Sequence, residues 1–450
     1  MLTAGVNSMM QNRPISKQET FLPTLLEEAR KGCQDIKDST KRKVNISLAD
    51  CLMSGVAMFG LKYPSLLQFD EDFRDENAIL QHNLKSLYGI ARVPSDTYFR
   101  ERADEVEPGA PQGIINKVIA LLKQRKAFEK YKYIEDHYLI SLDATGNFSS
   151  HDVYCDSCCI KNHKDGSVTY YHQTLAAVMV HPDQKTVFPL VIEPITKQDG
   201  RTKNDCEHSA AKRLLVNLRA FHPEMKIIVV MDGLYADGTI VELLKELNMR
   251  FIITAKEKDL DYLFDAYKGS KKQRSTIVCT KETELQFSFS EGLPLNYKHL
   301  DKQVNVLECD DIKKGKRIHF CWITNLSLTT SRRMTEKIAR GGRARWKIEN
   351  ETFNTLKNQG YNFEHNYGHG KKNLCTILSY LMFAAFLIDQ AQEYCCKYFK
   401  KLLKKCKSRT RLWRKLQGIV LNYFASTWEH VHLAIIRGLG IRLEDVLDTS

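Results

Sequence analysis

Three carboxylates in this sequence stand where they could hold divalent metal ions. Asp143 closes the apolar run 138–144, Asp232 closes the apolar run 226–232, and Glu349 lies in an amphipathic segment further on. Mg²⁺ prefers oxygen ligands and is usually held by a few carboxylates together with substrate phosphate. Two such ions, about 3.5–4 Å apart, can activate an attacking oxygen and stabilise a leaving one. The residue types therefore indicate metal-dependent phosphoryl transfer.

Basic residues accompany the third acid at helical spacing. At about 100° per residue, Arg345, Glu349 and Lys357 share roughly one face of a helix. Arg would grip a phosphate as a bidentate fork, and Lys would act as a point charge. Each acid also has an ordinary interpretation, because a strand-terminal Asp commonly forms a turn and a Glu beside Arg commonly makes a surface ion pair. The order strand–Asp, strand–Asp, helix–Glu favours the catalytic interpretation.

The elements around these acids predict an α/β fold. Strands are expected at 138–144, 169–180, 186–192, 226–232 and 250–255, with helices at 209–221 and 238–247. The last strand–helix–strand unit predicts a mostly parallel sheet, at whose strand ends carboxylates face the ligand crevice. Alternating apolar residues between about 270 and 326 predict a β-rich insertion, after which long helices return near residue 331.

The first 130 residues read as helical, and one part resembles a helix-turn-helix. Segment 83–106 contains two helices around a turn, with a cap at Ser95 or Asp96 and with Arg100 and Arg102 on the second helix. That second helix would enter a major groove of DNA. Plain helical packing is the alternative.

A basic segment near the end offers a second DNA contact. Residues 397–415 hold ten Lys or Arg and no acid, and the expected phosphate contacts are Lys404, Lys405, Arg409 and Arg411. Trp413 would add stacking. A solvated helix face and a membrane-surface helix are the alternatives.

The overall composition agrees with a nucleic-acid partner. The 450 residues, enough for two or three domains, carry a net charge of +13 and 43% hydrophobic residues. The uncharged stretch 373–388 is shorter than the roughly 20 residues of a membrane span, so we expect a buried core helix. Residues 1–20 lack the apolar core of a signal peptide, and the thirteen cysteines follow no regular framework, so reduced thiols in a cytoplasm are expected.

Cysteine and histidine residues between 151 and 208 invite a zinc interpretation. Cys155 and Cys158 have the two-residue spacing of a zinc knuckle, with His163 as the expected third ligand. The other candidates to complete four ligands are His172, Cys206 and His208. Free thiols in a loop are the alternative to a structural zinc site. His365 and His369 could approach phosphates or belong to a loop.

At these residues the chain resembles the DDE transposases of bacterial insertion sequences, specifically the insertion-sequence-4-like superfamily. The resemblance covers most of residues 138–390 and rests on SLDATG, VVMDGLYADG, ITNLSL and RWKIENETFNTLKNQGYNFEHNYGHG. It implies a ribonuclease H-like core with a β-strand domain inserted before the helix that carries the Glu. It also implies that Asp143, Asp232 and Glu349 form the acidic triad, which would bind Mg²⁺ or Mn²⁺.

The family signature around the Glu has Tyr, Arg, Glu and Lys at fixed spacing. Arg345 and Glu349 match it, whereas the Tyr position is Gly342 and the Lys position is Leu356, one residue before Lys357. Glu351 stands close enough to Glu349 to be an alternative third acid. Trp322 falls in the insertion, where an aromatic residue of this family can hold a flipped nucleotide; a buried strand position is the alternative.

We therefore expect a transposase that cuts the terminal inverted repeats of its element and joins them to target DNA. The expected regions are a helical DNA-binding domain (1–130), a ribonuclease H-like core in two parts (131–268 and 329–390), a β-strand insertion (269–328) and a basic helical end (391–450). A homodimer on double-stranded DNA in the bacterial cytoplasm, at the nucleoid and away from membranes, follows from the resemblance. A catalytically silent DNA-binding relative and a metal-dependent nuclease remain alternatives.

Overall fold

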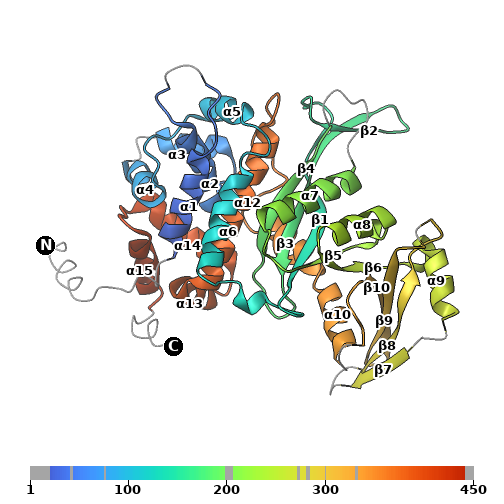
Figure 1. Cartoon of the computed structure of the whole chain (residues 1–450). Coiled ribbons are helices and arrows are strands. Elements are labelled where there is room, and N and C mark those ends of the chain that lie inside the picture. Colours follow the sequence, from blue (N-terminus) through green and yellow to red (C-terminus); the bar gives the residue numbers. More distant parts are fainter. Residues whose placement is uncertain are drawn as a thin grey trace.

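The computed structural model describes residues 21–40, 44–74, 78–197, 206–270, 274–279, 284–298, 300–329 and 333–440. Residues 1–20, for which we expected no signal peptide, and residue 331, near which helices were expected to return, lie outside these ranges. One mixed sheet runs through the described part, with a helical body on one side of it (Figure 1). The predicted α/β class is confirmed at this level.

The sheet is built around the two strands that precede the first two acids. Its order is β2-β3-β1-β5-β6-β10-β9-β8-β7, with β4 pairing to β3. The first six strands in the chain are β1 (Tyr138–Ser150), β2 (Cys159–Asn162), β3 (Val168–Val180), β4 (Phe188–Ile195), β5 (Ile227–Met231) and β6 (Arg250–Thr254). All five residues of β5 are buried, as expected for a strand covered on both faces.

The prediction of a mostly parallel sheet is wrong. Among the described strands, only the pairs β1–β5 and β5–β6 are parallel, and the other pairs are antiparallel. Short connections join β3 to β4 and β9 to β10, and a short connection reverses the chain between antiparallel neighbours. Only the two crossovers through α7 (Glu207–Phe221) and α8 (Gly238–Glu246) bring the chain back in the same direction.

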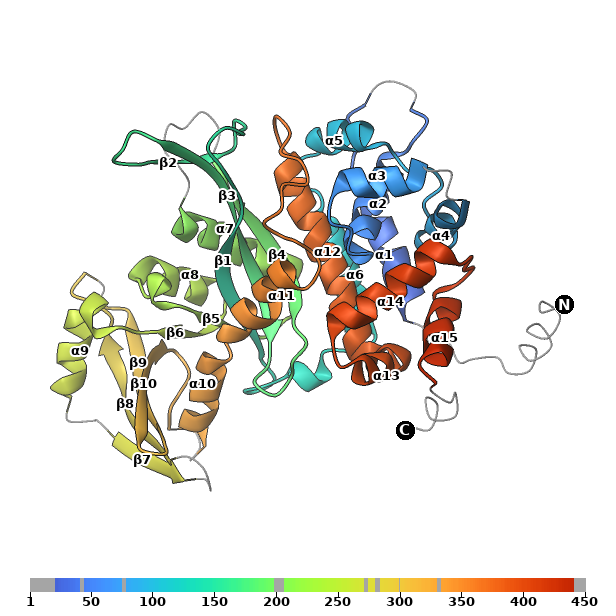
Figure 2. The same ribbon diagram turned by 180° about the vertical axis from the view of Figure 1, so that it is seen from behind.

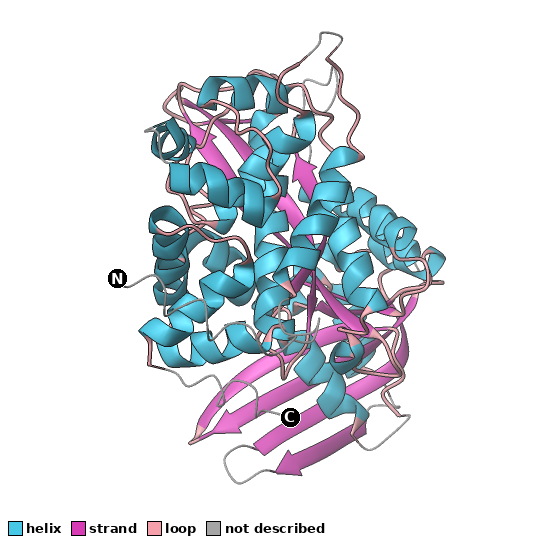
Figure 3. Cartoon of the chain, turned by 90° about the vertical axis from the view of Figure 1, so that its left-hand side faces the viewer, coloured by secondary structure: helices cyan, strands magenta, loops and turns pink. Residues whose placement is uncertain are grey.

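Strands occupy the stretch predicted to be β-rich, but they extend the core sheet rather than forming a sheet of their own. Its strands are β7 (Arg274–Cys279), β8 (Glu284–Pro294), β9 (Gln303–Lys313) and β10 (Lys316–Thr324), preceded by α9 (Asp261–Lys268). β10 joins β6 through the pairs Trp322–Thr254 and Ile323–Ile253. Figure 3 shows these strands as a curved sheet below the helices. The insertion is therefore fixed to the strand next to Asp232.

Helices cover both faces of the sheet. α7 and α8 lie on one face, and the segment with α10 (Met334–Arg343), π-helix η4 (Ile348–Phe353) and α11 (Asn354–Asn358) lies on the other (Figure 2). Glu349 is carried by the π-helix rather than by the regular α-helix we expected. Single π turns inside helices occur frequently at functional sites.

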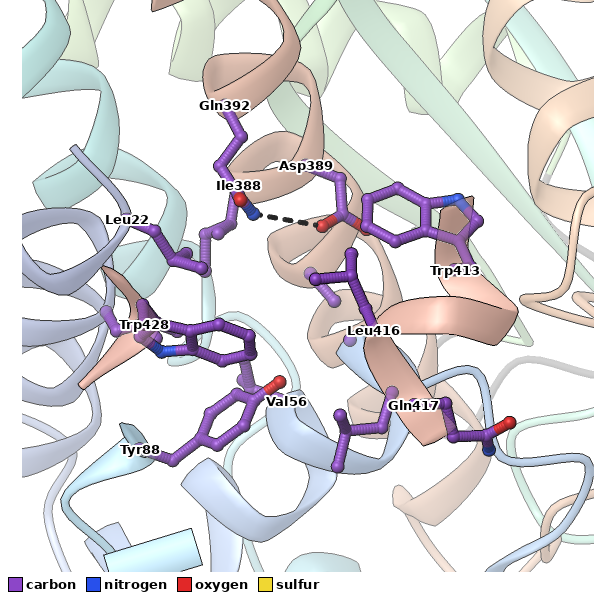
Figure 4. Close-up of a pocket in the computed structure, with 14 residues that line it drawn as sticks. Leu22, Val56, Tyr88, Ile388, Asp389, Gln392, Trp413, Leu416, Gln417 and Trp428 are labelled. Atoms are coloured by element: carbon purple, nitrogen blue, oxygen red, sulfur yellow. Dashed lines mark hydrogen bonds between the residues drawn. The ribbon is translucent and has the colours of Figure 1, made fainter. Parts of the chain in front are cut away.

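The helices from the two ends of the chain pack into one body, although the sequence suggested two separate regions. The N-terminal helices are α1 (Leu22–Gln34), α2 (Leu48–Gly60), α3 (Leu66–Arg74), α4 (Ala78–Tyr88), α5 (Asp96–Asp104) and α6 (Gln112–Gln124). The C-terminal ones are α12 (Leu374–Cys395), α13 (Lys397–Cys406), α14 (Arg409–Asn422) and α15 (Trp428–Gly438). The buried Asn83 amide donates to Val420 O at 2.7 Å, and Trp428 Nε1 donates to Leu87 O at 3.0 Å. Figure 4 shows side chains from both sets, including Tyr88, Asp389 and Trp428, around one apolar pocket.

Helix α12 is the centre of this body. It is long and apolar enough to cross a membrane by length and composition, yet its apolar window is completely buried inside the protein. Residues Leu374 to Gln392 are all buried, against α2, α5, α6 and β4 among others. The prediction of a core helix is confirmed.

Candidate active site

Asp143 and Asp232 lie on neighbouring parallel strands. Asp143 lies within β1, not at its end as predicted, because β1 continues to Ser150 along β3. Its pairing with β5 stops at Ser141, which faces Val230. If the same register is extended by two residues, Asp143 lies opposite Asp232, which directly follows β5. Both acids therefore lie just beyond the end of the parallel pairing between β1 and β5, where ligands bind in sheets of this kind.

Glu349 reaches Asp143 through Arg345. Arg345 Nη1 lies 2.9 Å from Glu349 Oε1 and 3.2 Å from Asp143 Oδ2, and its side chain is only 11% exposed. The hydroxyl of Ser141 donates to Arg345 O at 3.1 Å, which anchors the start of the π-helix to β1. The predicted pairing of Arg345 and Glu349 on one helix face is confirmed, and the same guanidinium also holds the first acid.

Glu351 is oriented away from this group. Its Oε2 lies 3.6 Å from Arg409 Nη1, and the guanidinium of Arg409 is held more closely by Glu393, at 2.7 Å from Nε. Two residues apart on a helix, Glu349 and Glu351 cannot share a face. The geometry therefore favours Glu349 over Glu351 as the third acid.

The electrostatics of Asp143 and Glu349 suit a cation. Burial raises the pKa of Asp143 well above its usual value, and the neighbouring Glu349 raises it further, while Arg345 lowers it. Asp232 accepts the backbone N–H of Leu234 at 2.8 Å through Oδ1 and so caps the short helix η2 (Gly233–Tyr235). The donor set is entirely carboxylate oxygen, which matches the preference of Mg²⁺ or Mn²⁺. The chemistry of these donors fits the implied metal, although the described carboxylates are not drawn together as closely as a bound ion would require.

A cleft of about 500 Å³ opens beside the acids. It is lined by 16 residues, which come from the ends of β5 and β6, from α9, β9 and β10, and from the turn between α10 and η4. Its charged residues include the acids Asp232, Glu257 and Glu308 and the bases Lys256, Arg343 and Arg345. Basic and aromatic side chains together are the lining that single-stranded nucleic acid needs. Lys256 and Arg343 had no signal in the sequence, because only the fold brings β6 and α10 together.

Two tryptophans line the same cleft with different exposure. Trp322 is 2% exposed and stacks on Phe320, with ring centroids 5.6 Å apart and planes 5° apart. Trp346 is 55% exposed, with the Arg345 guanidinium 5.3 Å from its ring centroid. The role of Trp322 as a nucleotide holder stays a prediction, and Trp346 is the more accessible of the two rings.

Gly342 stands at the position where the family signature has Tyr. The indole of Trp322 packs against it and fills the space where a side chain would lie. A Cβ atom on Gly342 would lie 2.4 Å from the indole Nε1 and 2.6 Å from Cε2. The indole therefore fills the space that a larger side chain would need. Lys357, next to the Lys position of the signature, pairs with Glu364 at 2.7 Å.

The predicted helix-turn-helix corresponds to α4 and α5. The cap at Ser95 is confirmed, since its hydroxyl accepts the N–H of Tyr98 at 3.3 Å. Arg100 pairs with Asp96 on its own helix, and Arg102, 10% exposed, pairs with Asp38. Both guanidinium groups are engaged within the protein, and DNA reading by this helix stays a prediction.

The basic C-terminal segment divides into exposed and buried residues. Lys404, Lys405 and Arg411 are exposed on α13 and α14. Arg409 is 9% exposed inside its carboxylate pair, and Trp413 is buried with Lys62 Nζ 4.2 Å from its ring centroid. Burial of Trp413 removes it as a stacking platform, contrary to our expectation, and Arg409 has a packing role in this structure.

The cysteine and histidine residues also divide into two groups. Cys155 and Cys158 lie together with His172 and His369, whereas His163 contacts Thr169 Oγ1 at 2.8 Å on the β2–β3 hairpin. Cys206 is exposed and His208 pairs with Asp237. The structure thus places His163 outside the group formed by Cys155, Cys158, His172 and His369. His369, which we had considered near phosphates, is 5% exposed and contacts Cys158 instead.

Part of the chain matches a known family of protein domains. No curated protein is similar enough to this chain to count as a match. A family profile described as "Transposase DDE domain" matches residues 155–387, which is just over half of the 450 residues. The match includes Asp232 and Glu349 and begins twelve residues after Asp143. The chain therefore belongs to the family of proteins with a transposase DDE domain.

Proposed function

We propose that the protein is a metal-dependent DNA transposase of the cut-and-paste type, with a ribonuclease H-like core and with Asp143, Asp232 and Glu349 as its metal ligands. The observation that carries the proposal is that one buried guanidinium, that of Arg345, contacts both Asp143 and Glu349. The register between β1 and β5, extended by two residues, places Asp143 opposite Asp232. The family match supplies the reaction class.

The residues of the site have distinct tasks in this proposal. The three carboxylates hold Mg²⁺ or Mn²⁺, which when bound lowers the pKa of water and stabilises charge on the phosphoryl oxygens. Arg345 keeps Asp143 and Glu349 close together before metal binding. Lys256 and Arg343 line the cleft and would face the phosphates of the bound strand. Each cut or joining step is an in-line phosphoryl transfer, in which positioning and charge stabilisation provide the catalysis.

The DNA-binding surface is proposed from exposed basic and aromatic residues. Lys404, Lys405 and Arg411 would contact the duplex of the terminal inverted repeats, and the exposed ring of Trp346 would stack on an unpaired base at the cut site. A homodimer that bridges two element ends, and action on DNA at the nucleoid of a bacterial cytoplasm, belong to the same proposal.

The deciding experiment is cleavage of a labelled duplex that carries the terminal repeats flanking the gene, with Mg²⁺ present. The wild-type chain should nick the repeat end and join it to a target duplex. Glu349→Gln should bind the DNA but lose about a thousandfold or more in cleavage, because loss of one charge-stabilising contact alone costs 10²–10³-fold. Glu351→Gln, the matched control, should cleave within about threefold of wild type, because exposed or long ion pairs contribute little.

Four results would overturn parts of the proposal. Equal cleavage by wild type and Glu349→Gln would remove Glu349 from the triad. Loss of cleavage in Glu351→Gln with full activity in Glu349→Gln would exchange the two acids. A wild-type chain that binds the repeats but never cuts them would be a silent DNA-binding relative, and one that cuts any branched DNA without joining would be a nuclease.

A further inference from the structure

Four buried side chains from three distant parts of the chain meet at one point away from the carboxylates. Cys155 and Cys158 lie in the loop between β1 and β2, His172 lies on β3, and His369 lies in the loop between α11 and α12. Each is less than 9% exposed, and their ligand atoms all lie within 4.8 Å of one another. No other set of this kind occurs among the residues that the structure describes.

Four of the six distances between these atoms are close to the edges of a tetrahedron around a metal ion. The two sulfur atoms are 3.9 Å apart, and the sulfur-to-Nε2 distances are 3.3 Å from Cys158 to His172, 3.3 Å from Cys158 to His369 and 3.4 Å from Cys155 to His172. Zn–S bonds of about 2.3 Å and Zn–N bonds of about 2.0–2.1 Å at tetrahedral angles give S–S edges of about 3.8 Å and S–N edges of about 3.6 Å. A disulfide, by contrast, requires sulfur atoms about 2.05 Å apart.

The four side chains direct their ligand atoms at one another. Both imidazoles turn Nε2 toward Cys158 Sγ, and the Nε2 of His172 also lies 3.4 Å from Cys155 Sγ. The other ring nitrogens, Nδ1 of His172 and of His369, are buried without a hydrogen-bond partner in the described structure. A cation bound by the two Nε2 atoms and the two sulfur atoms would be shared by all four converging atoms, and the ring proton of each imidazole would then lie on Nδ1.

We propose that Cys155, Cys158, His172 and His369 form a structural zinc site. Two sulfur and two nitrogen ligands in a tetrahedron select zinc, and four protein ligands leave no open position, which is the pattern of a structural rather than a catalytic site. The ion is separate from the one proposed for the carboxylates. The proposal therefore does not depend on the proposed function.

The position of His369 gives the zinc site a defined task. His369 belongs to the segment that follows the helix carrying Glu349, so the metal fastens this segment to β3 and to the loop between β1 and β2. The segment is tightly folded around it: Gly368 and Gly370 have φ of +144° and +71°, and Asp104 accepts the backbone N–H groups of residues 371–374. A Cβ on Gly370 would come within 2.3 Å of Asp104 Oδ1, so glycine is needed there.

The first test is the metal content of the full-length protein. Wild-type protein produced with zinc and dialysed against a weak chelator should retain about one zinc ion per chain, and Cys158→Ser and His369→Ala should each retain about a tenth of that or less. Cys159→Ala is the matched control, because Cys159 is a buried neighbour of Cys158 whose sulfur contacts Ile195 O instead. His163→Ala is a second control and should retain its zinc.

A second measurement keeps the proposal open to refutation if a ligand variant does not fold. Wild-type protein stripped with a strong chelator should melt at a lower temperature, recover on addition of one equivalent of Zn²⁺, and show the visible absorption of tetrahedral thiolate-bound Co²⁺ when cobalt is added. Folded wild-type protein with less than about a tenth of a zinc ion per chain, and without the cobalt spectrum, would overturn the proposal. Loss of zinc in His163→Ala or Cys159→Ala to the same degree as in Cys158→Ser would overturn the assigned ligands.

Discussion

Adding one methyl group at Gly342 should destabilise the protein through the side chain of Trp322. The new Cβ would lie 2.4, 2.6 and 2.9 Å from Nε1, Cε2 and Cδ1 of the indole. The indole cannot yield easily, because it is 2% exposed, stacked on Phe320 and part of a strand paired on both sides. Trp322 would have to leave its rotamer or move into the cleft beside the acids.

The size of the effect follows from two opposing contributions. Overpacking of a well-packed core costs about 1–3 kcal/mol, and three contacts below 3.0 Å place this case near the upper end. Replacing Gly by Ala inside a helix stabilises by about 1 kcal/mol. Gly342→Ala should therefore lower the stability by about 2 kcal/mol. For a chain of this size we expect a decrease of about 2–4 °C in melting temperature, measured by calorimetry at equal protein concentration.

Gly341→Ala is the matched control, since Gly341 is also buried in α10. Its Cβ would meet Ile252 Cδ1 at 3.2 Å and Tyr133 Cε1 at 3.3 Å, both within a few tenths of an ångström of ordinary contact. The helix gain should nearly cancel this smaller cost, so its melting temperature should stay within about 1 °C of wild type. In a Trp322→Leu background, Gly342→Ala should lose most of its effect, because the clashing atoms are gone. Equal melting temperatures for Gly341→Ala and Gly342→Ala, or an unchanged effect in the Trp322→Leu background, would refute the reasoning.

Two further predictions concern buried titratable groups. Lys62 Nζ lies 2.6 Å from Asp389 Oδ2, both side chains are under 8% exposed, and burial raises the pKa of Asp389. Lys62→Met should therefore cost about 3–5 kcal/mol in thermal unfolding, and adding Asp389→Leu should recover most of it; an unaltered melting temperature in the single variant would contradict this. Burial, with Lys123 Nζ 3.0 Å from Nδ1, lowers the pKa of His222 to about 3, against 6.5 in the unfolded chain. The unfolded state then binds more protons between these values, so stability is lost as the pH falls from about 6.5 toward 3, and His222→Asn should lose less between about pH 7 and 5 than wild type.

The sequence by itself determined the features that depend on local order. Apolar runs ending near Asp143 and Asp232 predicted the strands, helical spacing predicted the contact of Arg345 with Glu349, and the cap at Ser95 was read from four neighbouring residues. These succeed because strand and helix periodicity and capping involve residues close in the chain. The carboxylate chemistry and the family resemblance follow from residue types and motif spacing in the same way.

Only the tertiary structure decided which distant residues share a site. Glu349 rather than Glu351 faces Asp143 because a π turn and the Arg409–Glu393 pair orient the two acids differently. His369 rather than His163 joins Cys155 and Cys158, although the chain separates it from them by more than two hundred residues. Likewise, neither the antiparallel majority of the sheet nor the burial of Arg409 had a local signal. Such choices rest on packing between elements far apart in the chain, where several partners are equally compatible with local sequence and only the complete fold selects one.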